Sequence, residues 1–357
     1  MTKKPFEIGI HSFAELTPDP HTRIMISPAE RLKNLVEMVV LADKVGLDIF
    51  ALGEHHRPDF VSSAPEVILA AIAAKTKKIK LSSAVTVLSS DDPVRVFQRF
   101  ATLDLLSEGR AEIIAGRGSF IESFPLFGYD LRDYGELFSE KLQLLKQIRD
   151  NDRVTWSGNH RAALSDQAIY PRPYQDEMPI WVAVGGTPES VVRAANLGLP
   201  LALAIIGGRP EQFGPFADLY RDVLQKTGRN PADYPISINS HGFIADDRQD
   251  AIDTAFPAFK LMMDKIGRER GWGGDGMSKQ QFEASATVRG ADFVGSPDNI
   301  IEKILFQHAI FKHDRVSIMP GVGTMPHDKI MHMIELLGTK VAPVVRKEIA
   351  SRTGEIV

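Results

Sequence analysis

Short apolar runs alternate with amphipathic segments along the whole chain. We interpret eight apolar runs as β-strands, at residues 7–10, 49–52, 82–87, 111–115, 180–184, 201–206, 236–239 with 242–244, and 315–319. Apolar residues at helical spacing follow nearly every run, at 29–45, 65–75, 93–107, 134–149, 188–197, 211–227, 249–266 and 328–347. The chain therefore reads as repeated strand–helix units.

The unit at residues 81–119 carries the clearest boundary signals. Asp91 and Asp92 precede Pro93, which suits a capped helix start, and Gly109 suits the position just after the helix. Strands joined by single helices run parallel, so their functional loops emerge at one end. Eight such units favour a closed (β/α)8 TIM barrel over an open sheet.

Two segments interrupt this alternation and are expected as loop insertions at the carboxyl-terminal rim of the barrel. Residues 151–176 read as an irregular hairpin, and residues 268–292 are Gly-rich, polar and without a clear period. The second segment is our candidate lid. With no composition change elsewhere, we expect residues 1–357 to form a single barrel domain.

Composition narrows the choice of function. The formal net charge of −4 gives no reason to expect a nucleic-acid partner, and no apolar run approaches the ~20 residues needed to cross a bilayer. Because the chain has no cysteine, thiolate chemistry and disulfides are excluded. The amino terminus has no signal-like segment, so we expect a cytoplasmic protein.

Glu54, His55 and His56 directly follow the second strand, at the rim where a barrel carries its catalytic groups. A structural hydrogen-bonded pair is the alternative. The position favours a functional role for His55 and leaves His56 open. Adjacent histidines rarely converge on one ion, so we expect no metal site here.

Two glycine-rich turns point to an anion. Arg117 lies between Gly116 and Gly118 after the fourth strand, and Gly185-Gly186-Thr187-Pro188 opens a helix after the fifth. A helix start favours a phosphate, and a guanidinium can grip it. A solvated arginine and ordinary capping by Thr187 are the alternatives, but capping does not explain the paired glycines. Neither turn is a Rossmann or P-loop fingerprint.

These segments resemble the bacterial luciferase-like flavin monooxygenases. The resemblance rests on GEHH at 53–56, SSAVTVL at 82–88, LDLLSEGR at 103–110 with GRGS at 116–119, and VAVGGTPES at 182–190. GSPDNIIEKIL at 295–305 extends it towards the C-terminus, so it covers nearly the whole chain.

The resemblance implies a barrel that binds reduced FMN non-covalently at its rim, or a deazaflavin coenzyme in some branches. It places the FMN phosphate at Arg117 and Gly118, and at the helix start (Gly185, Gly186, Thr187 and Ser190). Ala84-Val85 matches a cis peptide behind the flavin ring, with Thr86 near the ring. His55 matches the family's acid–base histidine, with Glu54 beside it.

By the same resemblance we expect a monooxygenase that inserts one oxygen from O2 into a small organic substrate through a C4a-peroxyflavin. Reduced FMN would come from a separate NAD(P)H-flavin reductase, and the chain would form a homodimer. The alternatives are a deazaflavin-dependent hydride-transfer oxidoreductase and a non-catalytic flavin-binding barrel.

Overall fold

The computed structural model describes residues 5–271 and 276–353 and contains a closed ring of eight parallel strands. In ring order they are β1 (Glu7–Ser12), β2 (Ile49–Leu52), β3 (Lys80–Ser83), β5 (Ala111–Gly116), β8 (Ile180–Val184), β9 (Leu201–Ala204), β10 (Ile236–Ile244) and β12 (Arg315–Pro320). The ring closes because β12 pairs with both β1 and β10. The predicted (β/α)8 barrel is confirmed.

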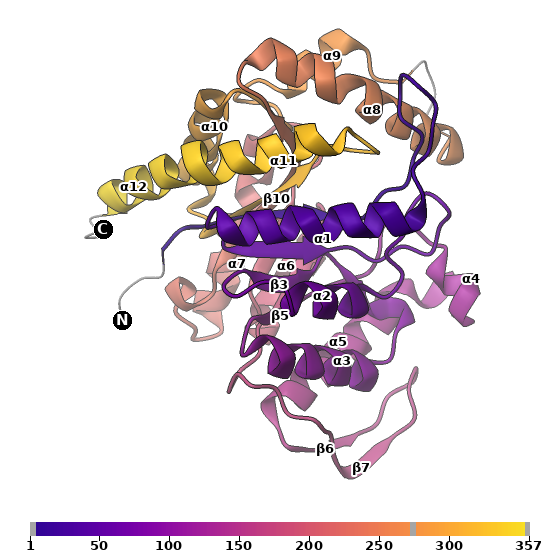
Figure 1. Ribbon diagram of the computed structural model, residues 1–357. Coiled ribbons are helices and arrows are strands. Elements are labelled where there is room, and N and C mark those ends of the chain that lie inside the picture. The colour runs from indigo at the N-terminus through magenta and orange to yellow at the C-terminus, as the bar shows by residue number, and fades with distance from the viewer. Residues whose placement is uncertain (1–4, 272–275, 354–357) are drawn as a thin grey trace.

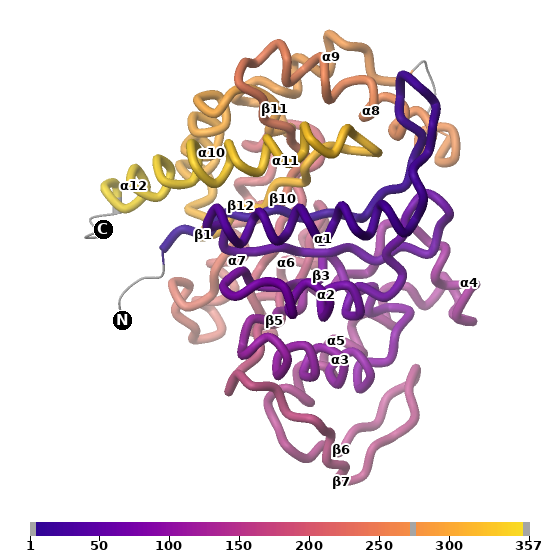
Figure 2. Tube along the Cα trace, in the orientation of Figure 1, coloured from indigo at the N-terminus to yellow at the C-terminus, as the bar shows by residue number. Residues whose placement is uncertain are grey.

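Helices cover the outside of this ring (Figure 1). They are α1 (Pro28–Lys44), α2 (Pro65–Ala73), α3 (Pro93–Ser107), α5 (Tyr134–Asp150), α6 (Pro188–Leu197), α7 (Gly214–Lys226), α8 (Arg248–Glu269), α10 (Pro297–Phe311), α11 (His327–Leu336) and α12 (Ala342–Thr353). The chain trace shows α1, α2 and α3 side by side in front of the strands that they connect (Figure 2). Asp92 caps α3 as predicted, accepting hydrogen bonds from the amides of Val94 and Arg95.

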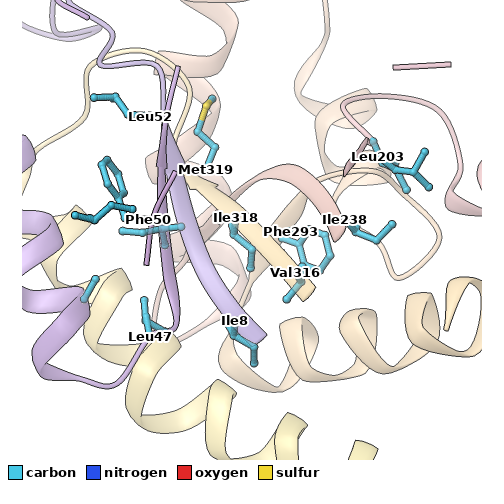
Figure 3. Close-up of a cluster of buried hydrophobic side chains, with 14 of the residues drawn as sticks. Ile8, Leu47, Phe50, Leu52, Leu203, Ile238, Phe293, Val316, Ile318 and Met319 are labelled. Atoms are coloured by element: carbon cyan, nitrogen blue, oxygen red, sulfur yellow. The ribbon is translucent and has the colours of Figure 1, made fainter. Parts of the chain in front are cut away.

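The main core lies between the strands and these helices. Figure 3 shows part of it, in which Phe50, Ile318 and Phe293 come from three different strands. A smaller apolar cluster inside the ring contains Ile114 and Trp181. Outward-facing residues of each strand therefore pack against the helices, while inward-facing residues fill the interior of the barrel.

Four charged side chains fill the amino-terminal end of the barrel. Arg315 forms a two-point hydrogen bond with Glu112, at 2.8 and 3.1 Å, and contacts Glu7 at 2.5 Å. Lys80 lies 3.5 Å from Glu112 and also pairs with Glu7. Because these residues come from β1, β3, β5 and β12, the network ties strands together across the ring.

The predicted hairpin insertion is present as antiparallel strands β6 (Arg153–Trp156) and β7 (Leu164–Ala168), which project below the barrel in Figure 1. Residues 268–292, expected as a loop insertion without a clear period, contain regular structure in the described part. Helix α9 (Lys279–Ser285) lies there, started by a capping box between Ser278 and Gln281.

Other boundaries also differ from the prediction. The third strand is broken into β3 and a two-residue β4 (Thr86–Val87). The long C-terminal helix is interrupted by a π-helical turn at Leu337–Val341, and the short strand β11 (Phe293–Gly295) pairs with β10 outside the ring. Over the described residues, no helix has the length and apolar character to span a membrane.

Candidate functional site

The sequence-predicted site residues gather at one end of the barrel, on four consecutive strands of the ring. They follow β2, β3 with β4, β5 and β8, which pair in that order and run parallel. The carboxyl ends of these strands therefore meet at one half of the rim.

Glu54 is held between a backbone amide and an imidazole. Its Oε2 accepts a hydrogen bond from the amide of Val87 at 2.9 Å, and its Oε1 lies 2.9 Å from Nε2 of His56. The hydrogen bond that His56 donates to Glu54 raises the pKa of His56 against the opposing effect of burial. Glu54 and His56 thus form a hydrogen-bonded pair that anchors the β4 segment to the end of β2. The catalytic role expected of Glu54 stays a prediction.

His55 points into an aromatic environment. Its ring stacks on Phe60, with centroids 4.1 Å apart. It makes T-shaped contacts with the rings of Phe13 and Phe120, at centroid distances of 5.4 and 5.0 Å. Its Nδ1 lies 3.2 Å from Oε1 of Glu122. Burial opposes ionisation of Glu122, but the hydrogen bond with His55 holds the pKa of that carboxyl below its usual value. Such a carboxylate fixes the ring orientation and leaves Nε2 without a hydrogen-bond partner among the described residues.

Glu122 and the three phenylalanines were not among the predicted site residues. Glu122 opens the short helix α4 (Ser123–Phe127) in the loop after β5, far along the chain from His55. Phe120 precedes Glu122 in the same loop. The sequence signal that could have pointed to this loop is the aromatic content of residues 120–129.

The peptide bond between Ala84 and Val85 is cis, as the resemblance implies. Glycines leave room for this segment: a Cβ on Gly116 would lie 2.6–3.0 Å from the Val85 side chain, and one on Gly53 would lie 3.0 Å from the Ala84 carbonyl oxygen. Thr86 is fully buried, and its hydroxyl has no hydrogen-bond partner within the described residues.

The two glycine-rich turns are in contact. Nη2 of Arg117 donates to Oγ1 of Thr187 at 3.3 Å, and that hydroxyl lies 2.8 Å from Oγ of Ser190. The Arg117 guanidinium also sits over the Tyr134 ring, 5.1 Å from its centroid, and Tyr134 donates to the Gly118 carbonyl. The structure thus brings Arg117, Gly118, Thr187 and Ser190 together.

Helix α6 begins as predicted, with Pro188 in its first turn and Thr187 at the N-cap position. Capping by the Thr187 side chain is wrong, however, because its hydroxyl makes no cap hydrogen bond and instead faces Arg117. Gly185 and Gly186 are exposed, and a Cβ on either would meet nothing within 4 Å. Gly186 has a φ of +138°, which only glycine adopts readily.

The end of α8 packs on the loop that carries Phe120. The guanidiniums of Arg57 and Arg270 lie 5.0 and 4.7 Å from the Phe120 ring centroid, and Arg270 donates to the Ser119 carbonyl at 3.0 Å. Arg57 in turn pairs with Glu269 at 2.6 Å. These contacts join the start of the candidate lid to the rim.

One further group of polar side chains was not anticipated. Potential ligand atoms of Asp133, Glu136 and His160 lie within 4.8 Å of one another, with His160 3.3 Å from Glu136. Glu136 is exposed, and the group joins the hairpin insertion to the start of α5. Exposed carboxylates of this kind pair readily with a histidine, so the group by itself indicates a surface contact.

Comparison with known proteins places this geometry in a family. A family model described as luciferase-like monooxygenase matches residues 6–311. An uncharacterised protein of Sinorhizobium fredii is 25% identical over 90% of this chain and 94% of its own length. N-acetyl-S-alkylcysteine monooxygenase of Bacillus subtilis is 33% identical, over 51% of this chain and 54% of its own. F420-dependent glucose-6-phosphate dehydrogenase of Amycolatopsis mediterranei is 31% identical, over 43% and 48%. The alignments with these two enzymes thus span about half of each chain.

Two solved structures share the whole fold. The monooxygenase RslO1 of Streptomyces bottropensis superposes with a TM-score of 0.81 at 23% identity, covering 95% of this chain and 99% of that one. The oxygenating constituent of 3,6-diketocamphane monooxygenase of Pseudomonas putida, solved in complex with FMN, gives a TM-score of 0.74 at 18% identity with the same coverage. The family model covers most of the chain, and the barrel agrees with it: this protein belongs to the luciferase-like monooxygenase family.

Proposed function

We propose that the protein is a flavin-dependent monooxygenase that uses reduced FMN and O2 to insert one oxygen atom into a small organic substrate. The observation that carries the proposal is the contact between Arg117 and Thr187 at the mouth of the barrel. A guanidinium, two hydroxyls and a helix start converge there, which is the chemistry that binds a phosphate.

The residues present fit a bound flavin. The open turn at Gly185 and Gly186 leaves space where a side chain would otherwise project, beside the first amides of α6. Along the rim, the buried hydroxyl of Thr86 lacks a partner within the described residues and supplies a polar group for the ring. Arg117, Thr187 and Ser190 would hold the phosphate, and residues 84–86 would support the ring.

When bound, reduced FMN supplies the electrons that activate O2. The chain's part is to orient, to exclude water and to handle a proton. His55, fixed by Glu122 and enclosed by Phe60 and Phe120, is placed to hold or deliver a proton through Nε2. The aromatic surroundings keep water away from that atom.

Deazaflavin-dependent hydride transfer is the second candidate. It is favoured by the F420-dependent relative of Amycolatopsis mediterranei, which matches this chain as well as the monooxygenase of Bacillus subtilis does over a similar length. On this reading the same rim would hold the deazaflavin coenzyme, and His55 would exchange a proton with an alcohol substrate.

Two partners belong to the proposal. Reduced FMN would be delivered by a separate NAD(P)H-flavin reductase, and the chain would act as a homodimer. Mixing the protein with a flavin reductase, NADH, FMN and an organic substrate tests the first, because oxygenated product should form only when both proteins are present. Oxygen consumption alone does not suffice, since free reduced FMN also reacts with O2. Sedimentation of the purified protein tests the second.

Titration with FMN, reduced FMN and the deazaflavin coenzyme, followed by flavin absorbance, tests the cofactor. We expect reduced FMN to bind and Arg117→Ala to weaken it more than tenfold, or about 1.4 kcal/mol or more, because the phosphate loses its guanidinium. Arg95→Gln, which removes an exposed arginine on α3, is the control and should bind normally. Equal affinity of Arg117→Ala and the parent protein would reject the phosphate assignment.

A further inference from the structure

Arg193 on α6 is a second guanidinium beside the candidate phosphate site. It follows Ser190 by three residues, so the two side chains are neighbours on one face of the helix. Its guanidinium lies 5.6 Å from the ring centroid of Phe138 on α5. Its Nη1 atom is buried and has no hydrogen-bond partner among residues 5–271 and 276–353. An unpartnered buried nitrogen of a charged group is costly unless something else satisfies it.

Arg117, in the loop after β5, contacts the same two helices one turn nearer their starts. Its guanidinium covers Tyr134, one helical turn before Phe138 on α5, and reaches Thr187, one turn before Ser190 on α6. Burial lowers the pKa of Arg193, and the charge of Arg117 lowers it further, while Glu189 opposes both. The two guanidiniums therefore lie close enough to repel each other.

Glu189 is the one carboxylate whose charge acts on Arg193. Among the described residues, however, no carboxylate oxygen lies within 4 Å of the Arg117 or Arg193 guanidinium. Two like charges at a half-buried position are unfavourable unless an anion joins them. A phosphate monoester carries a charge of about −1.5 to −2 at pH 7, whereas a phosphodiester carries one charge.

We propose that Arg193 binds the phosphate together with Arg117, and that this makes the site selective for a phosphate monoester, as in FMN, over a phosphodiester, as in the deazaflavin coenzyme. The inference rests on the proposed function and adds to it the chemical class of the cofactor. Arg193 would direct its buried Nη1 towards the phosphate oxygens, between the Ser190 hydroxyl and the Phe138 ring.

Binding of reduced FMN and reduced riboflavin under anaerobic conditions tests this role, because riboflavin lacks the phosphate. We expect Arg193→Gln to weaken FMN about tenfold or more and to leave riboflavin affinity within twofold. Arg193→Lys should recover part of the loss, and Arg95→Gln should change neither affinity. Parent protein should also bind FMN more tightly than the deazaflavin coenzyme.

A pH series provides a readout that a purely structural role would not move. The second ionisation of a phosphate monoester has a pKa of about 6. The ratio of FMN affinity to riboflavin affinity in the parent protein should therefore rise between pH 5 and pH 7.5, because ionisation of the reduced ring is common to both flavins and cancels in the ratio. Arg193→Gln should make that rise shallower.

Each contrary outcome has its own meaning. Equal losses for FMN and riboflavin in Arg193→Gln, or no loss for either, would overturn the role of Arg193. If Arg117→Ala lowers the FMN-to-riboflavin preference while Arg193→Gln does not, the proposed function stands and this inference fails. If the parent protein shows no preference for FMN over riboflavin, the phosphate site itself is wrong.

Discussion

The Thr187 hydroxyl decides between helix capping and anion binding as the role of this turn, because it faces Arg117 and makes no cap hydrogen bond. The sequence predicted the start of α6 correctly, because Thr187-Pro188 is a strong helix-start signal. It could not predict the side-chain partner, because Arg117 lies in another strand–helix unit and meets Thr187 only once the ring has closed. His55 shows the same limit, since its position at a strand end was readable but its partner Glu122 was not.

The position of His55 leads to a prediction about proton transfer. His55→Ala should bind reduced FMN within about twofold of the parent protein, because the residue lies away from the phosphate turns. Reaction of the bound reduced flavin with O2, followed by stopped-flow absorbance, should change by roughly 10² or more, the usual contribution of a general acid or base. His160→Ala, which alters a histidine of the hairpin insertion, should react normally. Unchanged kinetics in His55→Ala would remove the residue from the mechanism.

At the scale of elements, the predicted third strand divides where Ala84 and Val85 form their cis peptide. The apolar pattern runs through this break without a signal, so only the resemblance pointed to it. Strand β11 and helix α9 were missed for a different reason: both are too short to establish a period. Long periodic elements such as α1, α3 and α5 were predicted to within one or two residues of their observed ends.

Close packing of β5 against Val85 predicts a sensitive glycine. Gly116→Ala would place a Cβ within 3.0 Å of the Val85 side chain and so displace the segment that precedes Thr86. We expect a loss of about 1–3 kcal/mol in the free energy of unfolding, the usual cost of overpacking, together with weaker flavin binding. Gly135→Ala on α5 is the matched control, because its Cβ would meet nothing within 4 Å. Urea unfolding of both variants measures the difference, and equal stability would contradict this packing account.

At the scale of the whole molecule, the alternation of strands and helices was sufficient to predict the closed ring, because each unit repeats the same local pattern. The charged network of Glu7, Lys80, Glu112 and Arg315 inside that ring was not predicted. Its members come from four separate strands, and each reads as a surface charge in the sequence. Two carboxylates and two cations balance one another there.

Glu112 predicts how the barrel responds to acid. Burial alone would raise the pKa of Glu112, but the charges of Arg315 and Lys80 hold it below its usual value. Its contribution to stability is therefore complete above pH 4.5 and is lost as the pH falls through the lowered pKa. Glu112→Gln should reduce the free energy of unfolding at pH 7 by about 3–5 kcal/mol, because Arg315 loses its partner, and should make stability less dependent on acid.

The exposed ion pair of Asp166 with Arg153 provides the comparison. Asp166→Asn should leave the urea midpoint nearly unchanged at both pH 7 and pH 4, since an exposed pair contributes little. If Glu112→Gln were equally harmless at pH 7, the network would not be what holds the strands together.

The predicted cofactor-binding and catalytic residues all follow β2, β3, β5 and β8, which leaves the ends of the other strands free to vary with the substrate. The opposite arc, made of β9, β10, β12 and β1, carries neither the residues proposed to bind the phosphate nor His55. Substitutions along that arc can therefore change which substrate the protein accepts without altering the proposed flavin site. A search for altered reactant preference should therefore randomise the ends of β9, β10 and β12 and leave the other arc untouched.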